Sequence, residues 1–236
     1  MLIEQQPAYV LHARPYRETS LLLECLTRDH GRLGVVARGV RSERGRMQRA
    51  QLEPFQSLEV GLLQRGELAT LRSVETVASP LPLKGDAGLA GLYLNELVVR
   101  LTERQDPYPV LFDAYRQTLQ RLAGGESLGW QLRRFERDLM DALGYALQLD
   151  CDADSGDALI ADASYRYQAE HGPVRCRVNE PRALRGSDLL ALAADQMPDA
   201  AGLAALRGMM RDLIRFHLGG GELRAWRVLA AALTRR

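Results

Sequence analysis

The sequence has almost no lysine and few aromatic residues. Lys84 is the only lysine among 31 basic residues, so guanidinium groups carry nearly all of the positive charge. A GC-rich genome is sufficient to explain this bias, but guanidinium groups still bind phosphates in a forked geometry and stack on flat rings. Aromatic residues make up only 6% of the chain, which argues against a long platform for base stacking. Any binding of nucleic acid is therefore expected to depend mainly on electrostatics.

The chain also lacks the marks of a secreted or membrane protein. Its three cysteines, Cys25, Cys151 and Cys176, are odd in number and widely spaced, which argues against a disulfide framework. No apolar run approaches the roughly 20 residues that cross a bilayer, and the first residues do not form a signal peptide. A cytoplasmic protein with no membrane partner is expected.

Catalytic signatures are missing as well. The triplet Gly219-Gly220-Gly221 is followed by Glu222 and not by the Gly-Lys-Ser/Thr ending of a phosphate-binding loop. There is no HExxH motif and no nucleophile elbow. The four histidines are scattered singly, at positions 12, 30, 171 and 217. These absences favour a binding protein that is not an enzyme and needs no cofactor.

The first 80 residues have the pattern of a small β-barrel. Short segments of strand character are separated by turn residues, and Pro80 and Pro82 end the series. The expected strands are residues 8–16, 20–27, 32–40, 55–63 and 67–77. Five short strands within about 80 residues are typical of the OB-fold, although other small barrels share this count.

Beyond residue 80 the apolar residues recur at helical spacing. The expected helices are residues 88–103, 110–122, 128–143, 200–218 and 222–234. Residues 150–185 interrupt the pattern, and two alternating segments around Gly172 predict a hairpin there. The sequence therefore predicts a mixed β and α protein of two domains: an N-terminal OB-fold barrel over residues 1–80 and a C-terminal helical-bundle domain over residues 81–236, with a small insertion at about 150–185.

Residues 38–49 carry the strongest local charge. Five arginines stand against one acidic residue, and two glycines and a serine give the segment a loop-like composition. Arginines on a loop beside a barrel are suited to phosphate contacts, because each neutralised phosphate releases counterions. The alternative is an ordinary solvated loop. The arginines are Arg38, Arg41, Arg44, Arg46 and Arg49.

Two further basic features accompany this loop. Tyr16 lies between Arg14 and Arg17, so it is suited to stack on a base while the guanidinium groups hold the backbone, although a packed strand tyrosine is the simpler interpretation. Near the C-terminus, arginines 207, 211 and 215 recur every four residues. That stripe fits a solvated helix face as well as a DNA contact.

A metal site is not expected. A structural zinc site needs four ligands, usually in two close pairs, whereas Cys151 and Cys176 each stand alone and His171 is the only histidine near them.

Several segments resemble, in the same order, those of one known family. They are AYVLHARPYRETSLLLECLTRDHGRLGVVARGVR, LEPFQSLEV, ELATLRSVE, GLYLNELVVRL, LRRFERDLMDALGYALQLDCDA and FHLGGGELRAWRVL. Over nearly the whole chain they are similar to the RecO family of bacterial recombination mediators. One departure is that many members hold zinc with four cysteines where only Cys151 matches here, which places the chain with the zinc-free members.

The resemblance implies an OB-fold, a helical domain and a set of partners. Family members bind single- and double-stranded DNA, anneal complementary strands and, with RecR, help to load RecA onto DNA coated by single-strand-binding protein. The implied DNA-facing residues are Arg14 and Arg17 with the arginines of the 38–49 segment. A groove for the C-terminal tail of single-strand-binding protein is implied at Arg133, Leu139 and Leu143. Arg133 lies near a helix start, where the macrodipole disfavours a cation, which adds a motive for a binding role.

Two other functions remain open from the sequence. A generic OB-fold protein that binds RNA would share the barrel and the arginines. A nuclease on this scaffold would use the acidic run at positions 150, 152 and 154.

Overall fold

The chain forms two compact units. The structure, a computed structural model, describes residues 1–42, 46–178 and 180–233. Unit 1 comprises residues 1–125 and the chain from residue 223 onward, and unit 2 comprises residues 126–222. In the described part of the chain, no helix has the length and apolar character required to span a membrane.

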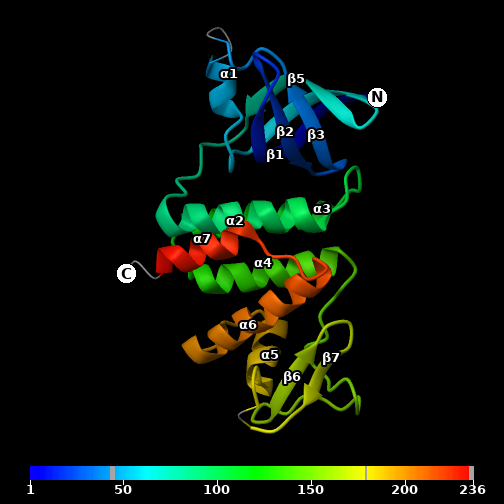
Figure 1. The fold of residues 1–236 in the computed structure, drawn as a ribbon, viewed down its shortest axis with the longest axis vertical. Helices are drawn as coiled ribbons and strands as arrows, with labels where there is room; N and C mark the ends of the chain where they lie inside the picture. The colour runs from blue at the N-terminus through cyan, green and yellow to red at the C-terminus, as the bar shows by residue number, and fades with distance from the viewer. Residues whose placement is uncertain (43–45, 179, 234–236) are drawn as a thin grey trace. The chain divides into compact units, whose positions relative to one another are not determined.

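Unit 1 is built on a closed five-stranded barrel in the order β1-β2-β3-β5-β4 (Figure 1). Strands β3 and β5 pair in parallel, and the other neighbours pair antiparallel. The strands are β1 (Leu2–Tyr16), β2 (Ser20–Thr27), β3 (Gly31–Ala37), β4 (Leu58–Arg65) and β5 (Leu68–Thr76). All five predicted strands and the OB-like barrel are confirmed. Alternate side chains such as Val10, Leu23, Val35 and Leu62 fill the interior.

Two helices of unit 1 follow the barrel in sequence. Helix α2 (Gly85–Leu101) buries Leu94, Leu97 and Val98 at helical spacing. Helix α3 (Pro109–Ala123) begins with proline in its first turn, where the missing N–H is not needed. Gly125, with a φ of +78°, follows its end in the left-handed conformation that glycine adopts easily. Both helices were predicted from the sequence and are confirmed.

Strand β1 connects the barrel to these helices. The ring of Tyr9 lies 5.4 Å from that of Phe112 and 5.1 Å from that of Tyr115, centroid to centroid. The pairing of β1 with β2 shifts register at Leu11, which is the extra residue of a β-bulge. The side-chain amide of Asn95 on α2 donates to the Leu11 carbonyl at 2.9 Å, and the Tyr115 hydroxyl donates to Asn95 Oδ1 at 2.6 Å. A buried polar chain therefore joins β1, α2 and α3.

Helix α7 (Arg224–Leu233) returns to unit 1 and packs beside α2 (Figure 1). The backbone N–H groups of Arg224 and Ala225 each donate to the Glu96 carboxylate of α2 at 2.8 Å. A carboxylate at this position satisfies N–H groups of the first turn and complements the positive end of the helix dipole. The predicted C-terminal helix is confirmed.

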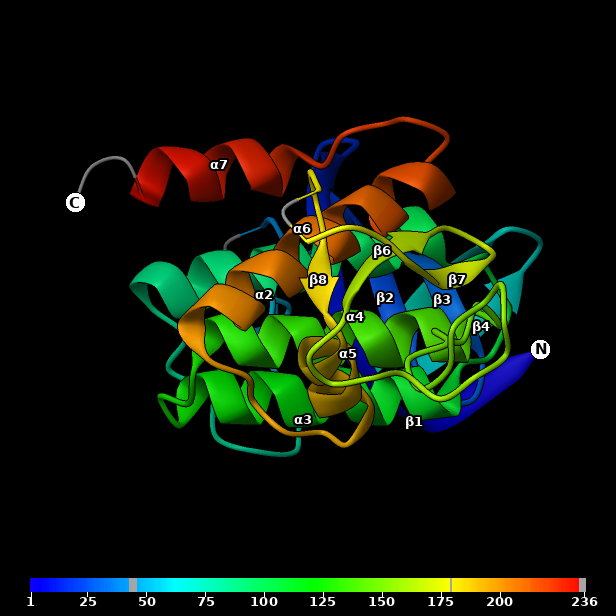
Figure 2. The same ribbon diagram turned by 90° about the horizontal axis from the view of Figure 1, so that it is seen from below.

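Unit 2 combines helices with a small three-stranded sheet in the order β7-β6-β8 (Figure 2). Its elements are α4 (Leu128–Ala142), β6 (Ser164–Gln168), β7 (Gly172–Arg175), β8 (Leu184–Arg185), α5 (Gly186–Ala193) and α6 (Ala200–His217). The predicted hairpin corresponds to β6 and β7, and α4 and α6 match predicted helices. Trp130, Tyr165, Leu189 and Met210 contribute to one core.

Three elements differ from the sequence prediction. Helix α1 (Arg46–Gln51) occupies part of the segment that was expected to be a loop, because residues 46–51 contain no glycine or proline and several good helix formers. Helix α5 and strand β8 lie within or beside a segment that was interpreted as irregular. Both are short, so neither gives a clear periodic pattern.

The two compact units also divide the chain differently from the predicted boundary at residue 80. That boundary corresponds to the change from strand to helix. Helices α2 and α3 nevertheless group with the barrel, because the Asn95 network and the Tyr9 ring contacts join them to β1. Helix α7 joins the same unit through its contacts with α2.

We expect Asn95→Leu to lower the free energy of unfolding by about 1–3 kcal/mol, because it removes the amide partner of buried groups. Urea unfolding measures this change. Gln120→Leu, at an exposed position on α3, is the control and should change stability by less than about 0.5 kcal/mol. Equal effects of the two substitutions would contradict the role of the network.

Candidate nucleic-acid interface

The turn between β1 and β2 lies against the loop that follows β3. The backbone N–H of Arg41 donates to the Thr19 carbonyl at 2.9 Å. The Arg41 guanidinium donates through Nη1 to the Arg17 carbonyl at 3.3 Å. Two arginines that are far apart in sequence are therefore held at the same end of the barrel.

The loop after β3 is anchored by a single apolar residue. Val40 is 1% exposed and belongs to the barrel core, whereas Arg38 and Arg41 on either side of it are exposed. Gly39 has a φ of +71°, and its carbonyl accepts the backbone N–H of Ser42 at 3.1 Å and the Ser42 hydroxyl at 2.6 Å. This turn therefore directs two guanidinium groups to the surface around a buried anchor.

The β1–β2 turn presents the other predicted residues. The Arg17 guanidinium carbon lies 5.3 Å from the centroid of the Tyr16 ring, which is cation–π range. Tyr16 is half-buried, and Arg14 and Arg17 are exposed. Arg17 has a φ of +53°, in the left-handed region that costs a non-glycine residue about 1–2 kcal/mol. The turn thus holds Arg17 beside an aromatic ring.

These arginines have no acidic partners among the residues that the structure describes. No carboxylate forms an ion pair with Arg14, Arg17, Arg38, Arg41 or Arg49 there. Arg44 lies outside the described residues, and for Arg46 only the backbone at the start of α1 is described. Arg49 is exposed at the end of α1. The described part of the predicted surface therefore carries uncompensated positive charge.

The arginine stripe of α6 is different. Glu222 pairs with Arg215 at 2.7 Å and with Arg211 at 3.9 Å. Asp212, on the same helix, pairs with Arg182. Glu222 therefore offsets part of the charge of Arg211 and Arg215, whereas Asp212 pairs with an arginine outside the stripe, which favours the interpretation of α6 as a partly compensated, solvated face.

Comparison with known proteins identifies the family. The model described as recombination protein O N terminal matches residues 1–80, and the model described as recombination protein O C terminal matches residues 83–227. The chain belongs to the RecO family. It is 48% identical to the DNA repair protein RecO of Stenotrophomonas maltophilia strain R551-3 and 44% identical to that of Xanthomonas euvesicatoria, over the full length of all chains. The RecO of Xylella fastidiosa strain M12 is 45% identical over 98% of this chain and 97% of its own length.

The structure places two of the three groove residues that the RecO resemblance implied in the interior. Arg133 is 4% exposed and Leu139 is fully buried, so neither lines an open surface, and only Leu143 is partly exposed. The Arg133 guanidinium donates to both carboxylate oxygens of Glu136, with Nε to Oε2 at 2.7 Å. Glu136, three residues further along α4, accounts for an arginine near a helix start without any peptide ligand.

A buried carboxylate, that of Asp152, organises the loop of residues 150–159. Asp152 Oδ1 accepts the backbone N–H groups of Asp154 at 2.9 Å and Ser155 at 3.2 Å, and Oδ2 accepts that of Arg175 at 3.1 Å. These bonds join the 150–159 loop to β7. Cys151 is contacted by the Gln148 amide. No cluster of three or more metal-ligating side chains occurs within the described ranges.

For this RecO-family chain we expect Arg133→Ala to be strongly destabilising, by about 3–5 kcal/mol, because it removes a charged partner from a buried carboxylate. The exposed i,i+3 pair of Arg116 and Asp113 is the matched control. Arg116→Ala should cost less than about 1 kcal/mol. Denaturant unfolding of both variants measures the difference. If Arg133→Ala leaves the free energy of unfolding nearly unchanged, Arg133 does not stabilise the interior through Glu136.

The Asp152 carboxylate predicts a pH-dependent contribution to stability. The N–H of Asp154, helped by those of Ser155 and Arg175, lowers the pKa of Asp152 in the folded protein. The ionised Asp152 carboxylate therefore stabilises the fold fully above the unfolded-state pKa of about 3.9. This stabilisation is lost as the pH falls through the lower folded-state pKa.

Thermal unfolding of Asp152→Asn should give a lower Tm than the parent at pH 7, with a gap that narrows below about pH 4. Asp162→Asn, at an exposed position, should match the parent at each pH. A gap that stays constant down to the lowest pH would mean that ionisation of Asp152 is not what stabilises the loop.

Proposed function

We propose that this chain is a mediator of DNA repair and homologous recombination that binds single- and double-stranded DNA with the end of its barrel. The observation that supports this best is the group of exposed arginines without acidic partners, held together by the bonds from Arg41 to Thr19 and Arg17. Such a surface neutralises phosphates without reading sequence. Tyr16 offers a single ring, so stacking contributes less than charge.

The mediator role extends this binding to partners. The chain anneals complementary strands and, together with RecR, helps to load RecA onto DNA coated by single-strand-binding protein. It acts without catalysis or cofactor. It also engages the C-terminal tail of single-strand-binding protein, at a surface other than the buried Arg133 and Leu139. Strand annealing on DNA coated with the cognate single-strand-binding protein tests this role, and failure to accelerate annealing would contradict it.

The two alternatives receive less support. A nuclease centred on Asp152 would need carboxylate oxygens that are free to hold a metal, but both oxygens of Asp152 accept backbone N–H groups and Asp154 contacts His171. An RNA-binding role would use the same arginines, so a competition between DNA and RNA of equal length distinguishes it from DNA binding.

We expect the double substitution Arg38→Ala with Arg41→Ala to flatten the salt dependence of binding. On single strands, two lost phosphate contacts should reduce the slope of log affinity against log salt by about 1.4, at about 0.7 per phosphate. Fluorescence anisotropy of a labelled oligonucleotide over a salt series measures the slope.

The matched control is Arg116→Ala with Arg182→Ala, which changes the net charge equally at arginines that are paired with acids. Its slope should stay close to that of the parent. If both double variants flatten the slope to the same extent, net charge rather than this surface governs binding. If neither does, the loop is not in the DNA site.

A further inference from the structure

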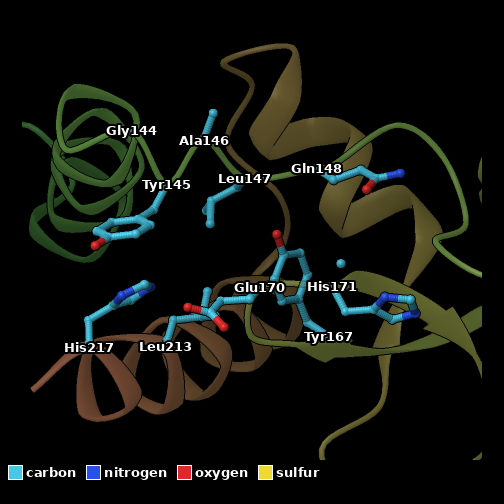
Figure 3. Close-up of a pocket in the computed structure, with 11 residues that line it drawn as sticks. Gly144, Tyr145, Ala146, Leu147, Gln148, Tyr167, Glu170, His171, Leu213 and His217 are labelled. Atoms are coloured by element: carbon cyan, nitrogen blue, oxygen red, sulfur yellow. The ribbon is translucent and has the colours of Figure 1, made fainter. Parts of the chain in front are cut away.

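Unit 2 contains a cavity of about 290 Å³ (Figure 3). It lies between the segment that follows α4, the turn between β6 and β7, and the end of α6. This volume is at the lower end of the range for ligand pockets, which suits one side chain or a small fragment rather than a large ligand. The residues that define its character are Tyr145, Leu147, Tyr167, Glu170, Leu213 and His217.

Aromatic rings form two sides of the pocket. The Tyr145 ring lies against that of His217 at an interplanar angle of 36°, with ring centroids 4.3 Å apart, and Phe216 meets His217 edge-on at 5.4 Å. Tyr145 is 49% exposed, so an aromatic ring remains open at the entrance. Tyr167 lies across the pocket from the tilted pair, on the other side of Glu170 (Figure 3). Leu147 and Leu213 supply apolar surface between them.

The Glu170 carboxylate points into this space (Figure 3). Within the described ranges it has no hydrogen bond or ion pair, whereas its neighbour His171 contacts Asp154 at 2.9 Å. Glu170 has a φ of +59° in a turn closed by the bond from the His171 N–H to the Gln168 carbonyl. Glycine or asparagine is the usual residue at such a position, so glutamate is held there at a conformational cost.

No arginine or lysine is among the described residues that line the pocket, so no permanent positive charge there offsets this carboxylate. Burial lowers the pKa of His217 below the usual histidine value, against the opposing effect of the Glu170 charge. Burial also raises the pKa of Tyr167 to about 12, so its ring stays neutral. The pocket is therefore aromatic and negatively charged.

We propose that this pocket binds the guanidinium group of an arginine side chain presented by a partner protein. A guanidinium is planar and cationic, so it can lie against a tyrosine ring while donating two parallel hydrogen bonds to one carboxylate. An acidic peptide tail is repelled by Glu170. A nucleotide is disfavoured too, because its phosphates would approach the same carboxylate. The site is separate from the arginine surface of the barrel and does not rest on DNA binding.

The test is an NMR titration of the full chain with Nα-acetyl-arginine N-methylamide, a peptide-like arginine. We expect saturable shifts at Tyr145, Glu170 and His217, and about tenfold or greater weakening in Glu170→Gln, the scale of a charged hydrogen bond. The matching citrulline derivative has the same shape without the charge and should bind far more weakly. Glu67→Gln, which changes the net charge equally at an exposed turn of unit 1, should bind arginine as the parent does.

Several results would overturn the proposal. These are the absence of saturable shifts at the pocket, equal binding of the arginine and citrulline derivatives, or equal weakening by Glu170→Gln and Glu67→Gln. Shifts at the pocket caused by a mononucleotide but not by the arginine derivative would assign it to nucleic acid instead. The amide spectrum of each variant reports its fold directly, so a loss of binding is not confused with unfolding.

Discussion

The carbonyl group of Leu11 needs a partner inside the protein, because the β-bulge in β1 removes it from the regular ladder. Asn95 supplies that partner and is itself held by Tyr115. Through this chain of bonds the bulge that bends β1 also determines how α2 and α3 lie against the barrel. The outer face of β1 is then buried along with its inner face, which explains the uninterrupted burial of residues 8–11.

Charge is arranged differently in different parts of the molecule. In unit 2, several arginines form ion pairs with nearby carboxylates. Examples are Arg133 with Glu136, Arg134 with Asp195 and Arg215 with Glu222. At the barrel end, the Arg41 guanidinium donates to the backbone carbonyl of Arg17 and not to a carboxylate, which leaves its charge uncompensated. A net charge of only +1 therefore coexists with one strongly basic surface, since most of the remaining charge is internally balanced.

The strands and long helices could be predicted because turn residues and apolar periodicity act locally. The basic loop was also visible, since charge is a property of residue types. The sequence does not show which face of α4 is buried, and this is why Arg133 was expected at a surface although it pairs with Glu136 in the interior. The pocket of unit 2 could not be predicted either, because its walls come from three segments that are separated in the sequence. Helix α5 was missed because eight residues give too few turns for a periodic signal.

The return of α7 to unit 1 has a consequence for synthesis on the ribosome. Glu96 accepts hydrogen bonds from Arg224 and Ala225, which follow it in the chain by 128 and 129 positions. The barrel strands are complete by residue 76, but the face of α2 that α7 covers stays bare until all of unit 2 has emerged. During that interval the nascent chain exposes more of this apolar face, including Leu89, and such a surface is of the kind that chaperones bind. The first unit to begin folding is thus the last to finish.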